Sequence, residues 1–246
     1  MTKRFLLLAL LIPFFFGSVQ AQFNQRNFSV QAGYQFKLLN PKAFNFILDD
    51  IFNTRSPLPV DPFTPVRWTP GLAVGAGFHR GKISLSAHFD QFGASSSAIA
   101  DDSLGTELQW DAKLMGWNAG VSFVSELVPF ADNGGVHVGG ALQMTKIQTG
   151  LATAPTTQAL PEYEITNNLN RMSFNIMLPI RYGPIPQFQF SIEPFYQVFF
   201  SPVGLRNFSN ALNGAVRTEE FSGGVISEMD HFGVTAKVIV FLIPRG

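Results

Sequence analysis

The chain has 246 residues, with 17 basic and 17 acidic side chains, a formal net charge of zero and no cysteine. This balance gives no electrostatic basis for binding nucleic acid, and the lack of cysteine excludes disulfides, a thiol nucleophile and cysteine-ligated metals. Charged residues make up only 14% of the chain while phenylalanine occurs 26 times, whereas about 25% of the residues of an ordinary soluble domain are charged.

The beginning of the chain predicts a cleaved signal peptide. A basic pair precedes an apolar run (Phe5–Phe16), and Val19-Gln20-Ala21 has the small-x-small pattern of a cleavage site. The run is too short for a spanning helix, which needs about 20 apolar residues. We expect residues 1–21 to be removed and residues 22–246 to form one domain. No later run is long enough to span a membrane, so the mature chain is either soluble or a β-barrel.

Strict alternation of apolar and polar residues predicts eight long strands after the signal peptide. Each is at least 11 residues long, enough for a tilted strand to cross a bilayer, which takes about 9–11 residues. One face is apolar and the other carries Gly, Ser, Gln, Thr and a few charges. The predicted strands are Asn27–Leu39, Val66–His79, Lys82–Phe92, Leu108–Leu127, Gly135–Ile147, Arg171–Tyr182, Gln187–Ser201 and Asp230–Ile243.

Two irregularities interrupt this pattern. In the fourth strand the apolar set changes parity, from Trp110, Ala112 and Leu114 to the series that begins at Trp117, which we interpret as a β-bulge near Met115–Gly116. Prolines also fall inside three predicted strands, where each removes a donor from the ladder. They are Pro70, Pro179 and Pro194. A secreted β-sandwich therefore remains the alternative to a barrel, although strands of this length are unusual in sandwiches.

Connections alternate between long and short, as in outer-membrane barrels with long external loops and short periplasmic turns. The long ones are Asn40–Pro65, Gly93–Glu107, Gln148–Asn170 and Pro202–Met229, and the short ones are Arg80-Gly81, Val128–Gly134 and Gly183–Pro186. An even number of strands places both termini in the periplasm. The sequence thus predicts an all-β, antiparallel, up-and-down transmembrane barrel in a bacterial outer membrane, with membrane lipid as its surroundings.

In signal peptide, strand number and loop alternation, the chain resembles the small outer-membrane barrels of the OmpA/OmpX type and the OmpW-like group. The resemblance covers Asn27 to Ile243 and implies an architecture. A fainter resemblance, carried by Asn40-Pro41, is to the PorP/SprF-like barrels of a secretion system. It implies partners among envelope or secretion-machinery proteins.

Several charged residues fall on the polar face, which lines the lumen of a barrel. They are Lys37, Arg67, His88, Asp90, Glu126, Arg171, Arg181, Glu193 and Lys237. Buried charges must be paired, so one interpretation is a set of ion pairs that fills the barrel. The other is a gate or a narrow ion path. An eight-stranded barrel is just wide enough for side chains to fill, so we expect no wide channel.

The first long loop carries a short amphipathic helix. Asn40 suits the N-cap and Pro41 the first helical position, and apolar residues then recur at helical spacing. They are Phe44, Ile47, Leu48, Ile51 and Phe52. Such a face usually covers something. It is either a docking site for a partner, or a cap that closes the barrel or lies on the membrane surface.

Nothing in the sequence favours catalysis or a cofactor. The four histidines have no metal-ligand spacing, and no Gly-x-Ser-x-Gly elbow occurs. We therefore expect a non-enzymatic barrel without cofactor or metal that acts as a structural or interaction subunit and docks partners through its external loops. The alternative is a narrow channel or carrier for small or hydrophobic solutes.

Overall fold

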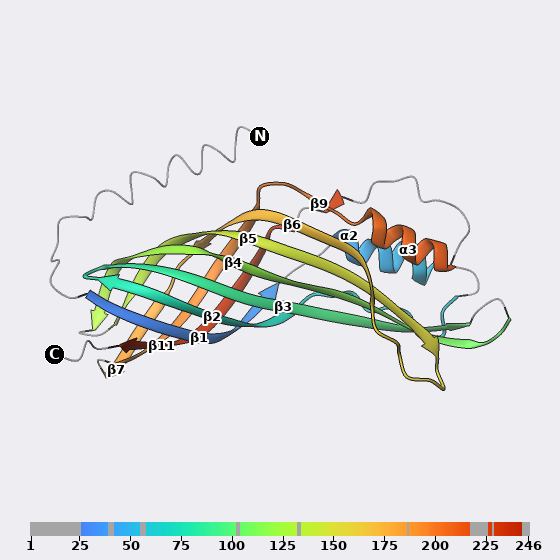
Figure 1. Ribbon diagram of the computed structural model, residues 1–246, viewed down its shortest axis with the longest axis horizontal. Coiled ribbons are helices and arrows are strands. Elements are labelled where there is room, and N and C mark those ends of the chain that lie inside the picture. Colours follow the sequence, from blue (N-terminus) through green and yellow to red (C-terminus); the bar gives the residue numbers. More distant parts are fainter. Residues whose placement is uncertain are drawn as a thin grey trace.

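The structure, a computed structural model, describes residues 26–38, 42–54, 58–101, 104–131, 134–185, 187–216, 226–227 and 229–242. The expected signal peptide, residues 1–21, lies outside the described residues. The described chain forms a closed antiparallel β-barrel, with two helical segments packed at one end (Figure 1).

The wall of the barrel and its cap are built from elements with the following bounds. The barrel strands are β1 (Arg26–Leu38), β2 (Thr69–Arg80), β3 (Ile83–Asp101), β4 (Glu107–Ala131), β5 (Gly134–Pro155), β6 (Glu164–Met177), β7 (Ile180–Ile185), β8 (Phe188–Phe199) and β11 (His231–Leu242). The remaining elements are α2 (Lys42–Phe46), the π-helical segment η1 (Ile47–Asn53), β9 (Val203–Gly204), α3 (Arg206–Val216) and β10 (Ile226–Ser227).

The barrel has eight wall positions, because β6 and β7 are two halves of one strand. Both pair with β5 on one side and β8 on the other, and the chain is interrupted between them at Leu178-Pro179. Neighbours along the chain are neighbours in the wall, and β11 pairs with both β8 and β1, which closes the ring. The predicted up-and-down barrel is thus confirmed, and a two-sheet sandwich is excluded. No helix among the described residues is long and apolar enough to cross a membrane.

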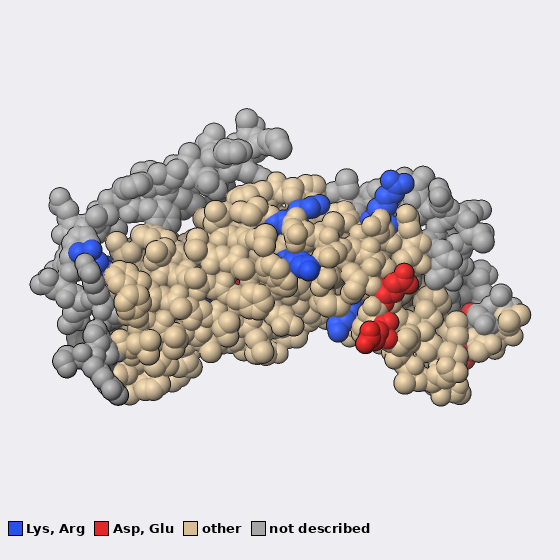
Figure 2. Space-filling view, in the orientation of Figure 1, with Lys and Arg blue, Asp and Glu red and all other residues tan. Residues whose placement is uncertain are grey.

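An apolar belt surrounds the outside of the barrel, as the alternation predicted. Its exposed members include Phe28, Val30, Tyr34, Phe36, Leu38, Leu72, Val74, Leu85, Phe89, Val121, Leu142, Met144, Met172, Leu178, Ile180, Tyr182, Phe188, Phe190, Ile192, Phe232, Val234, Val238 and Leu242. Figure 2 shows the charged residues of one face gathered mainly to the right, toward the helices, beside a broad uncharged band. A continuous apolar surface of this size is not stable in water, so the belt faces lipid.

Three strands continue well beyond the belt. β3, β4 and β5 have 19, 25 and 22 residues, about twice the 9–11 needed to cross a bilayer. The parts of these strands nearest α2 and α3 form a sheet that extends beyond the barrel (Figure 1). We call this end of the molecule the upper end, and the opposite end, with the short turns, the lower end. The expectation of long loops over Gly93–Glu107 and Gln148–Asn170 is therefore wrong in extent. These Ser-, Thr- and Ala-rich segments pair as strands, but they lack an apolar outer face because that face is outside the lipid.

The expected bulge near Met115–Gly116 is also wrong. β4 pairs without a register shift from Glu107 to Ser125, and its irregularities lie near the turn end, after Glu126 and after Pro129. The apolar residues before Gly116 belong to the inner face instead, since Trp110, Ala112 and Leu114 are all buried. The parity change marks the level at which the interior of the barrel changes from polar to apolar.

Candidate functional site

The lower part of the interior holds a polar network centred on Asp90. One carboxylate oxygen of Asp90, Oδ1, accepts hydrogen bonds from Gln35 Nε2 at 2.6 Å, Lys37 Nζ at 2.9 Å and Asn118 Nδ2 at 2.8 Å. Lys37 is 1% exposed and its ammonium also lies 4.0 Å from the centre of the Phe92 ring. A buried carboxylate with this many donors is kept in one orientation.

The network continues around the wall from Asn118. Its amide oxygen accepts a bond from Thr145 Oγ1 at 2.6 Å, and the Thr145 hydroxyl is 3.0 Å from that of Ser173. Gln197 Nε2 donates to Ser173 Oγ at 2.8 Å and to Thr145 Oγ1 at 3.1 Å. Side chains from six strands, β1, β3, β4, β5, β6 and β8, are thereby joined inside the barrel.

A second buried group of charges surrounds Glu193. Lys237 Nζ lies 2.6 Å from Glu193 Oε2, and the Arg181 guanidinium lies 3.9 Å from Oε1. Ser191 donates to the same carboxylate at 3.0 Å, and Arg181 Nη1 donates to Ser84 at 3.1 Å. These contacts connect β11, β8, β7 and β3 across the lumen.

The structure places six of the nine predicted lumen charges inside the barrel. Five form the two charge groups, and His88 bonds to Gln143 at 3.0 Å through its Nε2. The six are Lys37, His88, Asp90, Arg181, Glu193 and Lys237.

The other three lumen charges are placed differently. Arg67 is exposed, because β2 begins only at Thr69 and the residue lies beyond the barrel wall. Glu126 lies at the register shift near the end of β4 and pairs at 3.7 Å with the exposed Lys82. Arg171 is half-buried and donates to the backbone oxygens of Pro202 and Asn170 at the wall.

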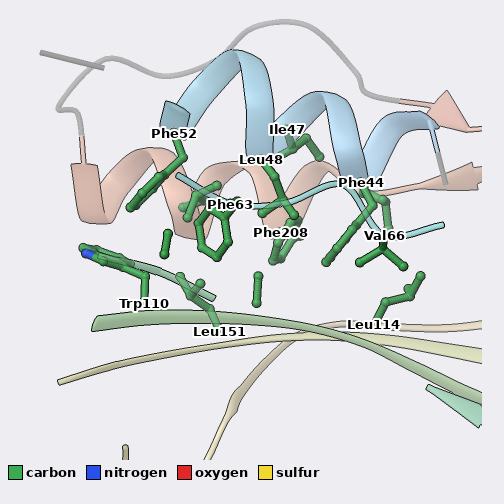
Figure 3. Packing of buried hydrophobic residues seen from close by; sticks show 14 of the residues in the cluster. Phe44, Ile47, Leu48, Phe52, Phe63, Val66, Trp110, Leu114, Leu151 and Phe208 are labelled. Atoms are coloured by element: carbon green, nitrogen blue, oxygen red, sulfur yellow. The ribbon is translucent and has the colours of Figure 1, made fainter. Parts of the chain in front are cut away.

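The upper part of the interior is apolar and is filled by a helical cap. α2 and η1 lie against the inner face of the extended sheet, next to α3, as Figure 3 shows. Phe44 of α2 stacks on Phe208 of α3 with ring centres 4.9 Å apart, and Phe52 contacts Trp110 of β4 edge-on at 5.3 Å. The underlying strand residues are small where the helices approach: Ala98, Ala100 and Ala112 are fully buried.

Two asparagines attach the returning chain to this cap. The amide of Asn45 donates to Val66 O at 2.9 Å and accepts from Val66 N at 2.8 Å, and Asn53 makes the same paired contact with Phe63 at 3.0 and 2.9 Å. Each side-chain amide makes the two hydrogen bonds that the backbone of a neighbouring strand residue would make. Phe63 and Val66 are thereby held in the apolar cluster.

The expected docking face is wrong for every side chain that the structure describes there. Phe44, Ile47 and Phe52 are 0% exposed and Leu48 is 2% exposed, whereas the side chain of Ile51 lies outside the described residues. Burying these apolar groups in the barrel mouth is more favourable than exposing them to water, at about 25 cal/mol per Å². The capping alternative describes the structure, and these side chains are not presented to a partner.

Sequence reasoning missed α3, which lies inside the loop expected at Pro202–Met229. Leu205, Phe208 and Leu212 from this segment are all fully buried in the cap. Their spacing of three and four residues is the helical signal that would have identified the element. They were missed because the surrounding segment is rich in Asn and Ser.

Outside the belt, Tyr163 folds back over the outer face of the extended sheet. Its hydroxyl donates to Asp111 Oδ2, and Lys113 Nζ lies 4.7 Å from the centre of its ring. The hydrogen bond to Asp111, together with partial desolvation, raises the pKa of Tyr163 to about 12. A Cβ on Gly150 would lie 3.1 Å from Tyr163 Cβ, so a glycine there allows the close approach.

A serine–histidine pair occurs near the turn end, where Ser29 Oγ and His79 Nε2 are 2.8 Å apart. Ser29 is 3% exposed, so a substrate cannot reach its hydroxyl. In the described part of the chain, no carboxylate bonds to the other ring nitrogen of His79, as the orienting member of a triad would. The same residues contain no group of three or more His, Cys, Asp or Glu that could hold a metal ion.

Solved structures with a similar fold include two small outer-membrane β-barrel proteins at low sequence identity. Neisserial surface protein A is 9% identical, with a TM-score of 0.43 over 88% of this chain and 99% of that chain. Ail, the attachment invasion locus protein of Yersinia pestis, is 9% identical, with a TM-score of 0.43 over 90% of this chain and 100% of that chain. Its complex with the heparin analogue sucrose octasulfate is 10% identical, with a TM-score of 0.41 over 89% and 99% of the two chains.

No protein-family profile and no curated protein matches the sequence.

Proposed function

We propose that this chain is a non-conducting, non-enzymatic outer-membrane barrel that acts as an interaction subunit of an envelope complex. A filled interior is the observation that carries the proposal: the polar network closes the lower part and the helical cap closes the upper part. Among the polar residues of the described interior there is a cavity of about 30 Å³, enough for about two water molecules. This favours an anchor over the narrow channel or solute carrier that was the alternative.

Conductance in planar bilayers tests the closed barrel. The purified protein should insert without unitary current steps at voltages of either sign, because the described side chains around Asp90 and Glu193 are buried and fill this part of the lumen. Reproducible single-channel steps from the folded protein would remove the anchor proposal and favour the channel. Folding is checked on the same sample by different gel migration of boiled and unboiled protein.

In the proposed orientation, residues 1–21 are removed, the strand ends near Arg26 and Leu242 face the periplasm, and the extended sheet lies outside the cell. The absence of native cysteine makes this testable with single-cysteine variants. Val60→Cys, beside the cap, should react with a membrane-impermeant maleimide in intact cells. Lys82→Cys, at the opposite end, should react only after the outer membrane is permeabilised. The reverse pattern would invert the topology.

The described external surface offers a docking region different from the buried cap face. Leu58 and Val60 are 72% and 68% exposed, on an arm that the backbone bonds between Asp61 and Ile99 hold beside β3. Leu104, at the β3–β4 connection, is 88% exposed. Large apolar side chains in water outside a lipid belt are typical of protein contacts when they are grouped.

A cross-linker attached to the thiol of the Val60→Cys variant in native membranes tests docking at this arm. We expect a discrete adduct with another envelope protein that decreases when Leu58→Ser is added. Lys82→Cys, with the same cross-linker, serves as the matched control and should give no such adduct. Equal adducts from both variants, or none from Val60→Cys, would contradict docking through the arm while leaving the conductance result unaffected.

A further inference from the structure

We propose that the lipid-facing wall holds one acyl chain of a membrane lipid in a defined groove. An apolar groove with a volume of about 500 Å³ crosses the outer face over β1, β11, β8, β6 and β5. This volume lies within the range of about 300–1,000 Å³ typical of small-molecule sites. The inference goes beyond the anchoring role, because an anchor needs only non-specific lipid contact.

The direction of the groove fits an extended hydrocarbon chain. It follows a row of paired residues, in which Phe36 faces Val234 and Val234 faces Pro194. One end is at Trp68, directly before the first residue of β2 at the loop end, and the other is at Val138, four residues after β5 begins at the turn end. Because the strands of a barrel are tilted, a row perpendicular to them runs obliquely from one border of the belt toward the other.

The length of this row also suits an acyl chain. Five inter-strand steps separate β2 from β5 along it, and at about 4.8 Å per step they cover about 24 Å. The apolar band of an outer-membrane barrel is about 25 Å tall. A chain lying in the groove would therefore remain within the hydrophobic thickness, inclined to the lipids around it.

Two prolines explain why the groove occurs at this place. Pro179 interrupts the wall between β6 and β7, and Pro194 lines the groove opposite Val234. Neither has an N–H to donate, so the ladder is weakened here, and the chain is kept together by bonds such as Leu178 N to Pro194 O at 3.0 Å. In the sequence, these prolines were evidence against a regular barrel. Their position at the groove accounts for them.

The floor of the groove separates it from the polar interior. Met177 and Phe195 line the groove, and they also line the cavity of about 30 Å³ beside Asp90 and Glu193. The Phe195 ring fits against Gly233, where an added Cβ would lie 2.3 Å from it. The described lining residues of the groove carry no charge, so the occupant is hydrocarbon, and the sealed floor keeps it on the lipid side.

Quenching of Trp68 by lipids with brominated acyl chains tests the site directly. Trp68 lies in the groove, Trp117 is half-buried on the outer face of β4, and Trp110 is 4% exposed beneath the cap. The protein in detergent micelles is titrated with brominated phosphatidylglycerol. In Trp117→Phe we expect quenching of Trp68 to saturate at one lipid per barrel. In Trp68→Phe, quenching of Trp117 should rise in proportion to the lipid fraction.

Filling the groove provides the matched comparison. Val234→Phe should abolish the saturable phase, whereas Val121→Phe, on the lipid-facing side of β4 and outside the groove, should leave it unchanged. Both changes keep an apolar residue in contact with lipid, and folding is checked by gel migration. Proportional quenching of Trp68, or a saturable phase that persists in Val234→Phe, would overturn the proposal. Neither result depends on whether the barrel conducts or binds a protein.

Discussion

Lys37 and Asp90 form a buried ion pair of 2.9 Å that reaches over an intervening strand. Lys37 belongs to β1 and Asp90 to β3, and β2 runs between them. The inner face of β2 makes the contact possible, because Gly71 lies between Thr69 and Ala73, the β2 residues that pair with Lys37 and Asp90. A Cβ on Gly71 would lie 1.8 Å from the backbone oxygen of Gln91. Gly71, like Gly75 further along β2, serves close packing inside the barrel.

Removing one partner of this pair should destabilise the barrel strongly. Asp90→Asn leaves the buried Lys37 ammonium without its counter-charge, which costs about 3–5 kcal/mol in comparable sites. Lys37→Met combined with Asp90→Asn should recover part of the loss, because no buried charge then remains unpaired. Reversible urea unfolding in lipid vesicles gives the free energy. Lys82→Met is the control, since the Lys82 side chain is 53% exposed and such a pair with Glu126 is worth about 0–1 kcal/mol.

A side chain at Gly75 should prevent the inner packing. Its Cβ would lie 2.6 Å from the backbone oxygen of Ala87 and 2.7 Å from Gln31 Nε2. Overpacking costs about 1–3 kcal/mol, and the backbone contact makes relief difficult, so Gly75→Val should lower the heat-modifiable folded fraction on gels. Ala76→Val, the next residue on the lipid-facing side, should fold normally. Equal folding of the two variants would contradict the close inner packing around Gly75.

The cap should shield Trp110 from water. Phe52→Ala removes the ring that contacts Trp110, and truncating a buried phenylalanine costs about 3–5 kcal/mol, so the cap should loosen locally. In a background with Trp68 and Trp117 changed to Phe, iodide should quench Trp110 several-fold more strongly in Phe52→Ala. Phe46→Ala, on the exposed side of α2, is the control. Unchanged quenching in Phe52→Ala would mean that the cap does not seal the barrel mouth.

The Tyr163 hydroxyl should lose its proton at a higher pH than an ordinary tyrosine does. Its pKa is raised to about 12 by the bond to Asp111, so this bond stabilises the folded state fully below the ordinary tyrosine pKa of about 10. The contribution is lost as the pH rises through about 12. Absorbance at 295 nm, as the difference between the native protein and Tyr163→Phe, isolates this group. Asp111→Asn should move the transition toward lower pH. A Tyr163 transition at the ordinary pKa would show that the bond is not formed.

Several features of the fold were predictable from local pattern alone. In β1, for example, Phe28, Val30 and Tyr34 face outward while Ser29 and Gln31 are buried, as period-two alternation predicted. The polar inner face likewise indicated where Lys37, Asp90 and Glu193 would lie. Their pairing was not predictable, because it depends on which strands are neighbours and on the space that the glycines of β2 leave.

The errors about the interior occurred where a residue's surroundings come from distant parts of the chain. Trp110 and Leu114 were assigned outward because they are apolar, yet they are buried under a cap formed by residues more than 40 positions away. Phe44 and Phe52 were assigned to a docking face, with a cap as the alternative, and they pack into the chain's own barrel mouth. Arg67 was placed on the inner face by the alternation of the sequence, but it lies beyond the end of the barrel wall.

The sequence by itself determined the ring of strands and the side of each that meets lipid, because alternation and strand length follow from short-range geometry and from the thickness of the bilayer. Only the tertiary structure decided what fills the interior. Whether an inward position needs a polar or an apolar residue depends on what lies opposite it, and α2, η1 and α3 reach that place only once the ring has closed.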